Sequence, residues 1–181
     1  MKRLIIPLLV IFALVACDNN GRRIREVWPA PDTGDLQMSA ETQKVFSLRR
    51  KAVLDTIGDG LLLLRSDYGY DGGRHEYRAA SNFWYLTGYA QPGTMMSLSG
   101  DAVMPYALYT RERSIRDIIY SGNLPGPGEL LRIWAPDTVM NYREADRVIS
   151  EAARSGRSVY VDFRDQMVRN RVTEILKQEK V

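Results

Sequence analysis

Residues 81–89, which read Ser-Asn-Phe-Trp-Tyr-Leu-Thr-Gly-Tyr, form a dense apolar block. Three consecutive aromatic side chains and a leucine precede Gly88, a residue that favours a turn. Aromatic side chains carry large apolar surfaces that folded proteins bury. The composition therefore predicts a core segment that ends in a turn, with Phe83, Trp84 and Leu86 as core residues.

A helix and a buried strand are predicted shortly before this block. Ser39 is a typical N-cap for a helix that runs to Ile57, and Gly58 suits its end. Residues 61–64 are four consecutive leucines, which is typical of a strand buried on both faces. A helix, a turn and a buried strand favour an α/β layer fold. The helix is expected to carry a broad apolar stripe formed by Phe46, Val53, Ile57, Val45, Leu48 and Ala52.

A hairpin is predicted in the middle of the chain. Strands over 95–98 and 104–109 flank a Gly-Asp turn at 100–101, and a third strand is expected over 118–120. Residues 67–73, rich in glycine and aspartate, are expected to form a loop.

The last third of the chain alternates between helical and strand patterns. A helix is predicted over 143–153, a strand over 158–163 and a helix over 165–178. This alternation favours parallel pairing, so the hairpin would make the sheet mixed. Residues 121–128 are interpreted as a structural loop, because their two prolines lack the N–H groups that a phosphate-binding loop supplies.

The aromatic block also resembles a family signature. In the N-terminal domain of the aminopeptidase P, prolidase and creatinase family the pattern is Arg, two variable residues, Ser, Asn or Asp, Phe, two aromatics or near equivalents, Thr and Gly. The matching residues, without a gap, are Arg78, Ser81, Asn82, Phe83, Trp84, Tyr85, Thr87 and Gly88, with Leu86 inside the motif. The resemblance extends over about 45–181, although Tyr120 stands where the family usually has Trp.

This resemblance implies an α/β fold in which a mixed sheet with ribonuclease-H-like topology is flanked by helices, over 39–181. In the family this domain is non-catalytic. It packs on a catalytic metallopeptidase domain, helps assembly into homo-oligomers and partly walls the active site. The catalytic domain binds two divalent ions, often manganese, through two Asp, one His and two Glu. Those ligands would lie beyond Val181, so the chain is expected to be a truncated or split part of an Xaa-Pro aminopeptidase-like enzyme.

The catalytic domain would then act in cis or in trans, and this chain alone is expected to be inactive. Arg78, Asn82 and Tyr85 are the candidates for contact with it. Structural alternatives stay open, since Arg78 could pair with a carboxylate and Asn82 could cap the aromatic segment. Another possibility is a stand-alone lipoprotein that binds a peptide or a partner, and a third is a degenerate remnant without a role.

The N-terminal segment has the layout of a secretory signal. Two basic residues precede an apolar run over 4–16, which is shorter than the ~20 residues that cross a bilayer. The run ends in Leu-Val-Ala-Cys and resembles the bacterial lipobox, in which the thiol of Cys17 is acylated and residues 1–16 are removed. Lipid on Cys17 would hold the protein at a membrane, on the periplasmic or other extracytoplasmic face, with 17–38 as a flexible tether. An ordinary cysteine or an uncleaved anchor is the alternative.

Little in the sequence points to chemistry within this chain. His75 is the only histidine, and with Asp71 and Glu76 it lies in a glycine-rich loop, so neither a metal site nor a catalytic residue is expected. Asp162 and Asp165 are interpreted as a turn and a helix cap. The formal charge of +3 becomes 23 basic against 22 acidic residues without Lys2 and Arg3, and the local arginine clusters are too small to predict nucleic-acid binding.

Overall fold

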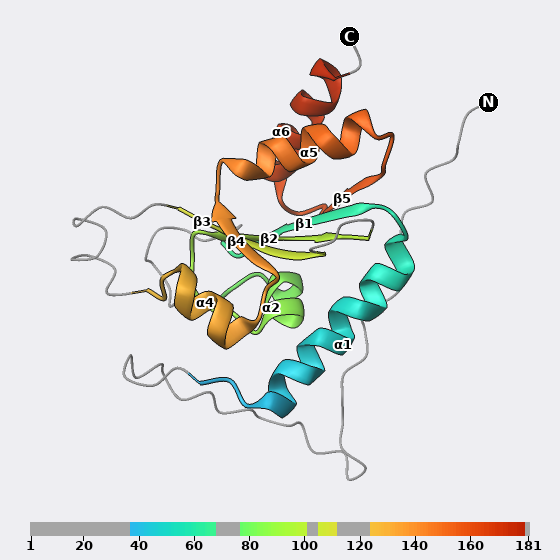
Figure 1. The fold of residues 1–181 in the computed structure, drawn as a ribbon. Coiled ribbons are helices and arrows are strands. Elements are labelled where there is room, and N and C mark those ends of the chain that lie inside the picture. The colour runs from blue at the N-terminus through green and yellow to red at the C-terminus, as the bar shows by residue number, and fades with distance from the viewer. Residues whose placement is uncertain (1–36, 68–76, 101–104, 112–123, 180–181) are drawn as a thin grey trace. The chain divides into compact units, whose positions relative to one another are not determined.

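The computed structural model describes residues 37–67, 77–100, 105–111 and 124–179, all within the unit Asp35–Val181. Residues 17–36 of the predicted tether, the lipidation site Cys17, the loop around His75 and the strand predicted over 118–120 lie outside these residues. The last tether residue, Met38, is partly buried against the core, so the prediction of a flexible tether is wrong for this residue. The elements are α1 (Ala40–Ile57), β1 (Leu61–Arg65), α2 (Ser81–Thr87), β2 (Thr94–Ser99), β3 (Tyr106–Thr110), α4 (Pro127–Trp134), β4 (Thr138–Asn141), α5 (Glu144–Arg154), β5 (Val159–Val161) and α6 (Gln166–Gln178) (Figure 1).

The five strands form one mixed sheet in the order β4-β3-β2-β1-β5. β1, β2 and β3 are antiparallel neighbours, with Leu63 opposite Ser97 and Ser97 opposite Ala107. β5 runs parallel to β1, and β4 runs parallel to β3. The α/β class, the mixed sheet, the hairpin and the parallel pairing of the last strands are therefore confirmed. An antiparallel β1-β2-β3 meander with a parallel strand beside β1 is consistent with the expected ribonuclease-H-like topology.

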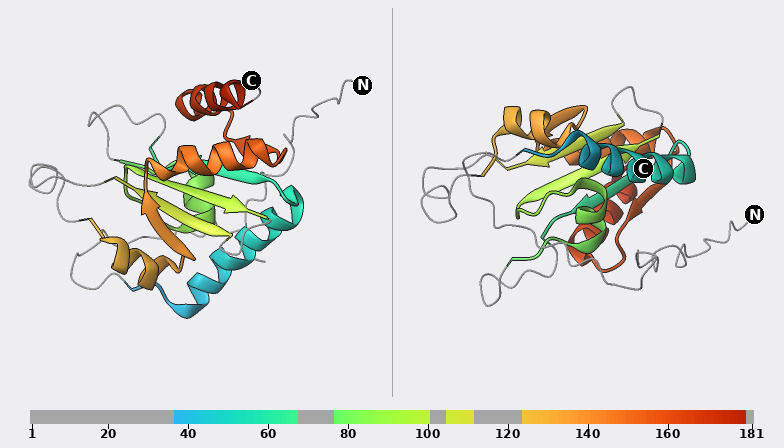
Figure 2. Two further views of the ribbon diagram at one scale, coloured as in Figure 1. Left: turned by 45° about the horizontal axis from the view of Figure 1, so that its top comes forward. Right: turned by 90° about the horizontal axis from the view of Figure 1, so that it is seen from below.

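Helices cover both faces of the sheet, and the two faces hold separate apolar cores (Figures 1 and 2). The leucines of β1 contribute to both cores, because successive side chains of a strand point to opposite faces of the sheet. Leu64 packs with α1, α2 and α4 on one face, whereas Leu61 and Leu63 pack with α5 and α6 on the other. The run of leucines is thus buried from both sides, as the sequence predicts.

Helix α1 begins where the sequence predicts and buries a narrower stripe than expected. Ser39 is its N-cap, and the Ser39 side chain accepts a hydrogen bond from the Thr42 N–H. Phe46 is buried in the core, but Val45 is 45% exposed and Leu48 is 58% exposed. The prediction of a broad apolar stripe is therefore wrong for the part formed by Val45, Leu48 and Ala52, which are exposed. The sheet and α2 cover only the side of the helix that carries Phe46 and Ile57.

Helix α4 and strand β4 were not predicted. Residues 127–128 belong to the first turn of α4, so the interpretation of 121–128 as a loop is wrong for its last two residues. Pro127 occupies the first turn, where its missing N–H costs nothing, and Glu129 Oε2 accepts from the Gly126 N–H at 2.9 Å. These two features start a helix in a segment whose proline and glycine content favours a loop.

Candidate functional site: the motif helix and the end of the sheet

The aromatic block folds into the short helix α2, and Gly88 ends it. Gly88 has φ +68°, in the left-handed region, and its N–H donates to the Trp84 carbonyl at 2.7 Å. A Cβ at this position would also come within 2.5 Å of the Phe46 ring of α1. The motif glycine therefore serves two purposes, since it stops α2 and lets α1 approach closely.

Most of the motif residues support the fold from inside. Phe83, Leu86 and Thr87 are buried. The Thr87 hydroxyl donates to the Phe83 carbonyl at 2.9 Å and accepts from the Tyr89 N–H at 3.0 Å. Trp84 was predicted as a core residue, but it is only partly buried and meets the edge of the Phe46 ring at a centroid distance of 6.3 Å.

Asn82 connects α2 to the end of β5. Its Nδ2 donates to Asp162 Oδ2 at 2.7 Å. Asp162 also accepts from the backbone N–H and the guanidinium of Arg164, at 3.0 to 3.2 Å, which confirms its interpretation as a turn residue. The N-cap of α2 is Ala80, without a side-chain hydrogen bond, so the alternative that Asn82 caps the helix is wrong. Ser81, next to it, is exposed.

Tyr85 lies against α1 instead. The Arg49 guanidinium stands 4.3 Å from the centre of the Tyr85 ring, and its Nη1 donates to the Tyr85 carbonyl at 3.1 Å. Its neighbour Arg50, buried over the Tyr106 ring, donates to the Leu86 carbonyl at 3.0 Å. Two arginines thus satisfy carbonyls at the end of α2, where positive charge is favourable. Burial lowers the pKa of Arg50 from its ordinary value, against the opposing influence of Tyr106 and Asp137.

The three candidate contact residues therefore do not form one cluster. Arg78 is exposed just before α2, and no hydrogen bond or ion pair joins its side chain to another described residue. Asn82 is engaged with Asp162, and Tyr85 is engaged with Arg49. Of the three, Arg78 has the side chain most available to a partner.

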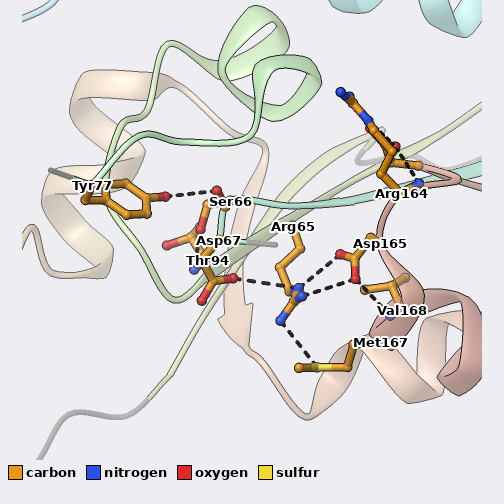
Figure 3. Close-up of polar contacts among 10 residues, drawn as sticks. Arg65, Ser66, Asp67, Tyr77, Thr94, Arg164, Asp165, Met167 and Val168 are labelled. Atoms are coloured by element: carbon orange, nitrogen blue, oxygen red, sulfur yellow. Dashed lines mark hydrogen bonds and ion pairs between the residues drawn. The ribbon is translucent and has the colours of Figure 1, made fainter. Parts of the chain in front are cut away.

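A second group of polar residues lies where the parallel strands β1 and β5 end (Figure 3). Arg65 Nε and Nη2 donate to the two carboxylate oxygens of Asp165 at 3.0 and 3.1 Å, and both side chains are buried. Arg65 Nη1 meets the Met167 sulfur at 3.3 Å. Asp165 Oδ1 also accepts from the Val168 N–H, so the predicted cap of α6 is confirmed. Sequence reasoning missed the ion pair.

Electrostatics at this end of the sheet favour the charged form of Arg65. Burial acts to lower the pKa of Arg65, but the hydrogen bond and charge of Asp165 outweigh it and raise that pKa above its ordinary value. Asp67 lies 3.7 Å from Arg65 Nε and contributes in the same direction. Ser66, which lies between Arg65 and Asp67 in the sequence, is held in place by two hydrogen bonds. Its carbonyl accepts from the Tyr77 hydroxyl, and its Oγ accepts from the Thr94 N–H (Figure 3).

The buried pair of Arg65 and Asp165 joins the end of the sheet to the start of α6. Within the described ranges, no three His, Cys, Asp or Glu side chains lie close enough to hold a metal ion. The described residues therefore provide no set of ligands for the two manganese ions implied for a catalytic domain. His75 and its acidic neighbours lie outside the described residues. In the same described part, no helix is both long and apolar enough to cross a membrane.

Comparison with known proteins identifies the domain. The family model of the aminopeptidase P N-terminal domain matches residues 46–160, which include α1 from Phe46, the motif helix and most of the sheet. The chain belongs to this family. Among curated proteins, none matches the sequence.

Solved structures have the same fold as this aminopeptidase P N-terminal domain. The Pseudomonas aeruginosa aminopeptidase PepP is 22% identical with a TM-score of 0.66, over 80% of this chain and 33% of that one. A variant of Escherichia coli aminopeptidase P is 18% identical with a TM-score of 0.60, over 79% and 33%. Proline aminopeptidase P II from Yersinia pestis is 22% identical with a TM-score of 0.57, over 76% and 33%. The chain thus spans about a third of the length of these proteins.

Proposed function

We propose that this chain is the non-catalytic N-terminal domain of an Xaa-Pro aminopeptidase-like metallopeptidase. The observation that carries the proposal is the length of the match. The fold covers 80% of this chain but only 33% of the Pseudomonas aeruginosa aminopeptidase. The remaining two thirds of such a protein would hold the catalytic domain with its two manganese ions. That domain would be joined to this one in cis or supplied in trans.

In this proposal the domain helps assembly and forms part of the wall of the active site. Arg78 is the leading contact residue, because its guanidinium is exposed directly beside α2. Asn82 and Tyr85 would act together with the groups that hold them, Asp162 and Arg49. The hydrogen bond to Asp162 fixes the Asn82 side chain, and the Arg49 guanidinium over the Tyr85 ring restrains that ring before a partner arrives. Docking would therefore lose little conformational entropy.

We further propose that the protein is held at a membrane by lipid on Cys17. Support comes from the sequence alone, namely basic residues, a short apolar run and the single cysteine directly after small residues. Palmitate labelling tests this part separately. Labelling is expected for the natural sequence and should be lost in the Cys17→Ser variant. Undiminished labelling of that variant would refute the lipid anchor.

The main proposal is tested by adding a catalytic domain. The purified chain alone should not release the first residue of an Xaa-Pro peptide in the presence of manganese. It should bind the aminopeptidase P catalytic domain encoded in the same genome and raise that domain's activity. Turnover by this chain alone would refute a non-catalytic role, and failure to bind or activate the catalytic domain would favour a stand-alone binding protein.

A matched pair of variants locates the contact. Arg78→Ala should weaken binding to the catalytic domain, whereas Arg132→Ala, which removes an exposed arginine from α4, should leave binding unchanged. Because both side chains are exposed, neither change should alter the thermal unfolding of the free domain. Equal effects of the two variants on binding would exclude a specific contact through Arg78.

A further inference from the structure

A methionine sulfur serves as a hydrogen-bond acceptor for the buried Arg65 guanidinium. Arg65 Nη1 lies 3.3 Å from Met167 Sδ, while Nε and Nη2 donate to Asp165 (Figure 3). Among the described residues, Sδ is the only hydrogen-bond acceptor of Nη1. A thioether is a weak acceptor, whereas a guanidinium is a strong and permanently charged donor. The Nη1 group of this buried side chain is therefore paired with a poorly matched acceptor.

Met167 is also open to solvent. It is 58% exposed, and it is the only methionine among the exposed large hydrophobic residues in the described part of the chain. Met95 and Met96 of β2 are buried, and Met140 of β4 is partly buried. Susceptibility of sulfur side chains to oxidants follows their exposure. Of these four methionines, Met167 should therefore react first.

We propose that Met167 is a site of reversible oxidation to methionine sulfoxide by hydrogen peroxide, and that Arg65 binds the added oxygen. A sulfur lone pair attacks one peroxide oxygen, so that an S–O bond forms as the O–O bond breaks. The other oxygen leaves as water, taking the proton of the transferred oxygen. The sulfur is oxidised by two electrons and the peroxide is reduced by two. Methionine sulfoxide reductases reverse such a step. This inference does not depend on the proposed peptidase role.

The position of the guanidinium predicts which sulfoxide forms. A thioether sulfur has two lone pairs, and oxygen on one or the other gives the two sulfoxide epimers. Arg65 Nη1 covers one lone pair of Met167 Sδ, so the peroxide reaches the other. One epimer should therefore dominate at Met167 in the folded protein, whereas a freely exposed sulfur would give both.

The added oxygen should strengthen the junction between β1 and α6. Oxidation makes the side chain polar, and its oxygen is a better acceptor for a charged donor than the sulfur. Rotation about the Cγ–Sδ bond of this flexible side chain brings the oxygen toward Nη1. Met167 lies exposed in the first turn of α6, so the oxygen is not forced into an apolar core. Arg65 would then be held firmly by two residues of α6, Met167 and its N-cap Asp165.

Peptide mapping by mass spectrometry tests the selectivity. The full chain carries Cys17→Ser, so that no thiol consumes peroxide. With limiting hydrogen peroxide, Met167 should be oxidised several-fold faster than Met95 and Met96 in the folded chain, and at a similar rate in urea. Digestion and treatment with reductases A and B, each specific for one epimer, then give the epimer ratio at Met167. The ratio should be several to one for the folded chain and near equality for chain oxidised in urea.

Urea unfolding tests the contact with Arg65. The oxidised chain should unfold at a higher urea concentration than the reduced chain. Met167→Leu, which keeps the apolar bulk without an oxidisable sulfur, is the matched control and should show no such shift at the same peroxide dose. Oxidation of Met167 no faster than that of Met95, equal amounts of the two epimers, or an unchanged or lower midpoint after oxidation would each overturn the proposal. The same shift in Met167→Leu would also overturn it, because the shift would then come from another residue.

Discussion

Arg65 and Asp165 lie 100 positions apart in the chain and form a buried ion pair with two hydrogen bonds, at 3.0 and 3.1 Å. Arg65 ends β1, and Asp165 caps α6 through the Val168 N–H. The pair therefore fastens α6 to the end of the sheet. Breaking such a pair from one side leaves a buried charge without its partner.

Asp165→Asn should be strongly destabilising even though asparagine is as good an N-cap as aspartate. The change keeps the cap but leaves the Arg65 cation buried, which costs about 3–5 kcal/mol. The Asp67 carboxylate, 3.7 Å from Arg65 Nε, still offsets part of the Arg65 charge, so the loss of unfolding free energy should lie near the lower end of this range. Urea unfolding measures the difference. In the exposed pair of Lys51 with Asp55, Asp55→Asn should cost about 0.5 kcal/mol or less. Similar losses for the two variants would contradict this role of the buried pair.

The ion pair also shows what sequence reasoning can reach. Local signals predicted the cap, because Asp165 directly precedes a helical pattern and its partner, the Val168 N–H, is three residues away. The pairing with Arg65 depends on β5 lying beside β1, and no periodicity within either segment specifies that neighbour. Sheet order had to be known before the two charges could be placed together.

The missed helix α4 has a different cause. Its N-terminal signals, Pro127 in the first turn and Glu129 three residues after Gly126, were present in the sequence. The surrounding prolines and glycines favoured a loop, and the helix has only eight residues. Strand β4 is shorter still, with four half-buried residues and no alternation to reveal it. Short elements leave too few residues for a period to emerge.

Gly88→Ala should destabilise the domain more than Gly93→Ala. Both glycines have positive φ, +68° and +73°, so each substitution carries a backbone strain of about 1–2 kcal/mol. Only at Gly88 would the new methyl group meet the Phe46 ring, and overpacking of this kind adds about 1–3 kcal/mol. Thermal or urea unfolding of both variants separates strain from packing. Equal losses would show that Phe46 moves aside freely.

Tyr106→Phe should be neutral or slightly stabilising, whereas Tyr109→Phe should be destabilising. Both tyrosines are buried on β3, but they differ in the state of the hydroxyl. The Tyr106 hydroxyl has no hydrogen-bond partner among the described residues, while the Tyr109 hydroxyl lies 2.9 Å from Ser97 Oγ. Removing an unpaired buried hydroxyl removes a desolvation cost, but removing a paired one leaves Ser97 unsatisfied, which costs about 1–3 kcal/mol. Urea unfolding compares them, and a larger loss for Tyr106→Phe would contradict this account.

Arg154→Met should raise the pKa of the Glu179 carboxyl. The Arg154 guanidinium donates to both carboxylate oxygens of Glu179, at 2.8 and 3.0 Å, and this hydrogen bonding lowers the Glu179 pKa, with burial opposing it. Because the folded-state pKa is depressed, the pair stabilises the fold above the ordinary glutamate pKa and loses that contribution as pH falls through the folded value. An NMR titration of the Glu179 carboxyl carbon measures the shift. Arg147→Met, which breaks the exposed contact with Glu144, is the control and should leave the Glu179 pKa unchanged. An unaltered Glu179 titration in Arg154→Met would show that this contact does not persist in solution.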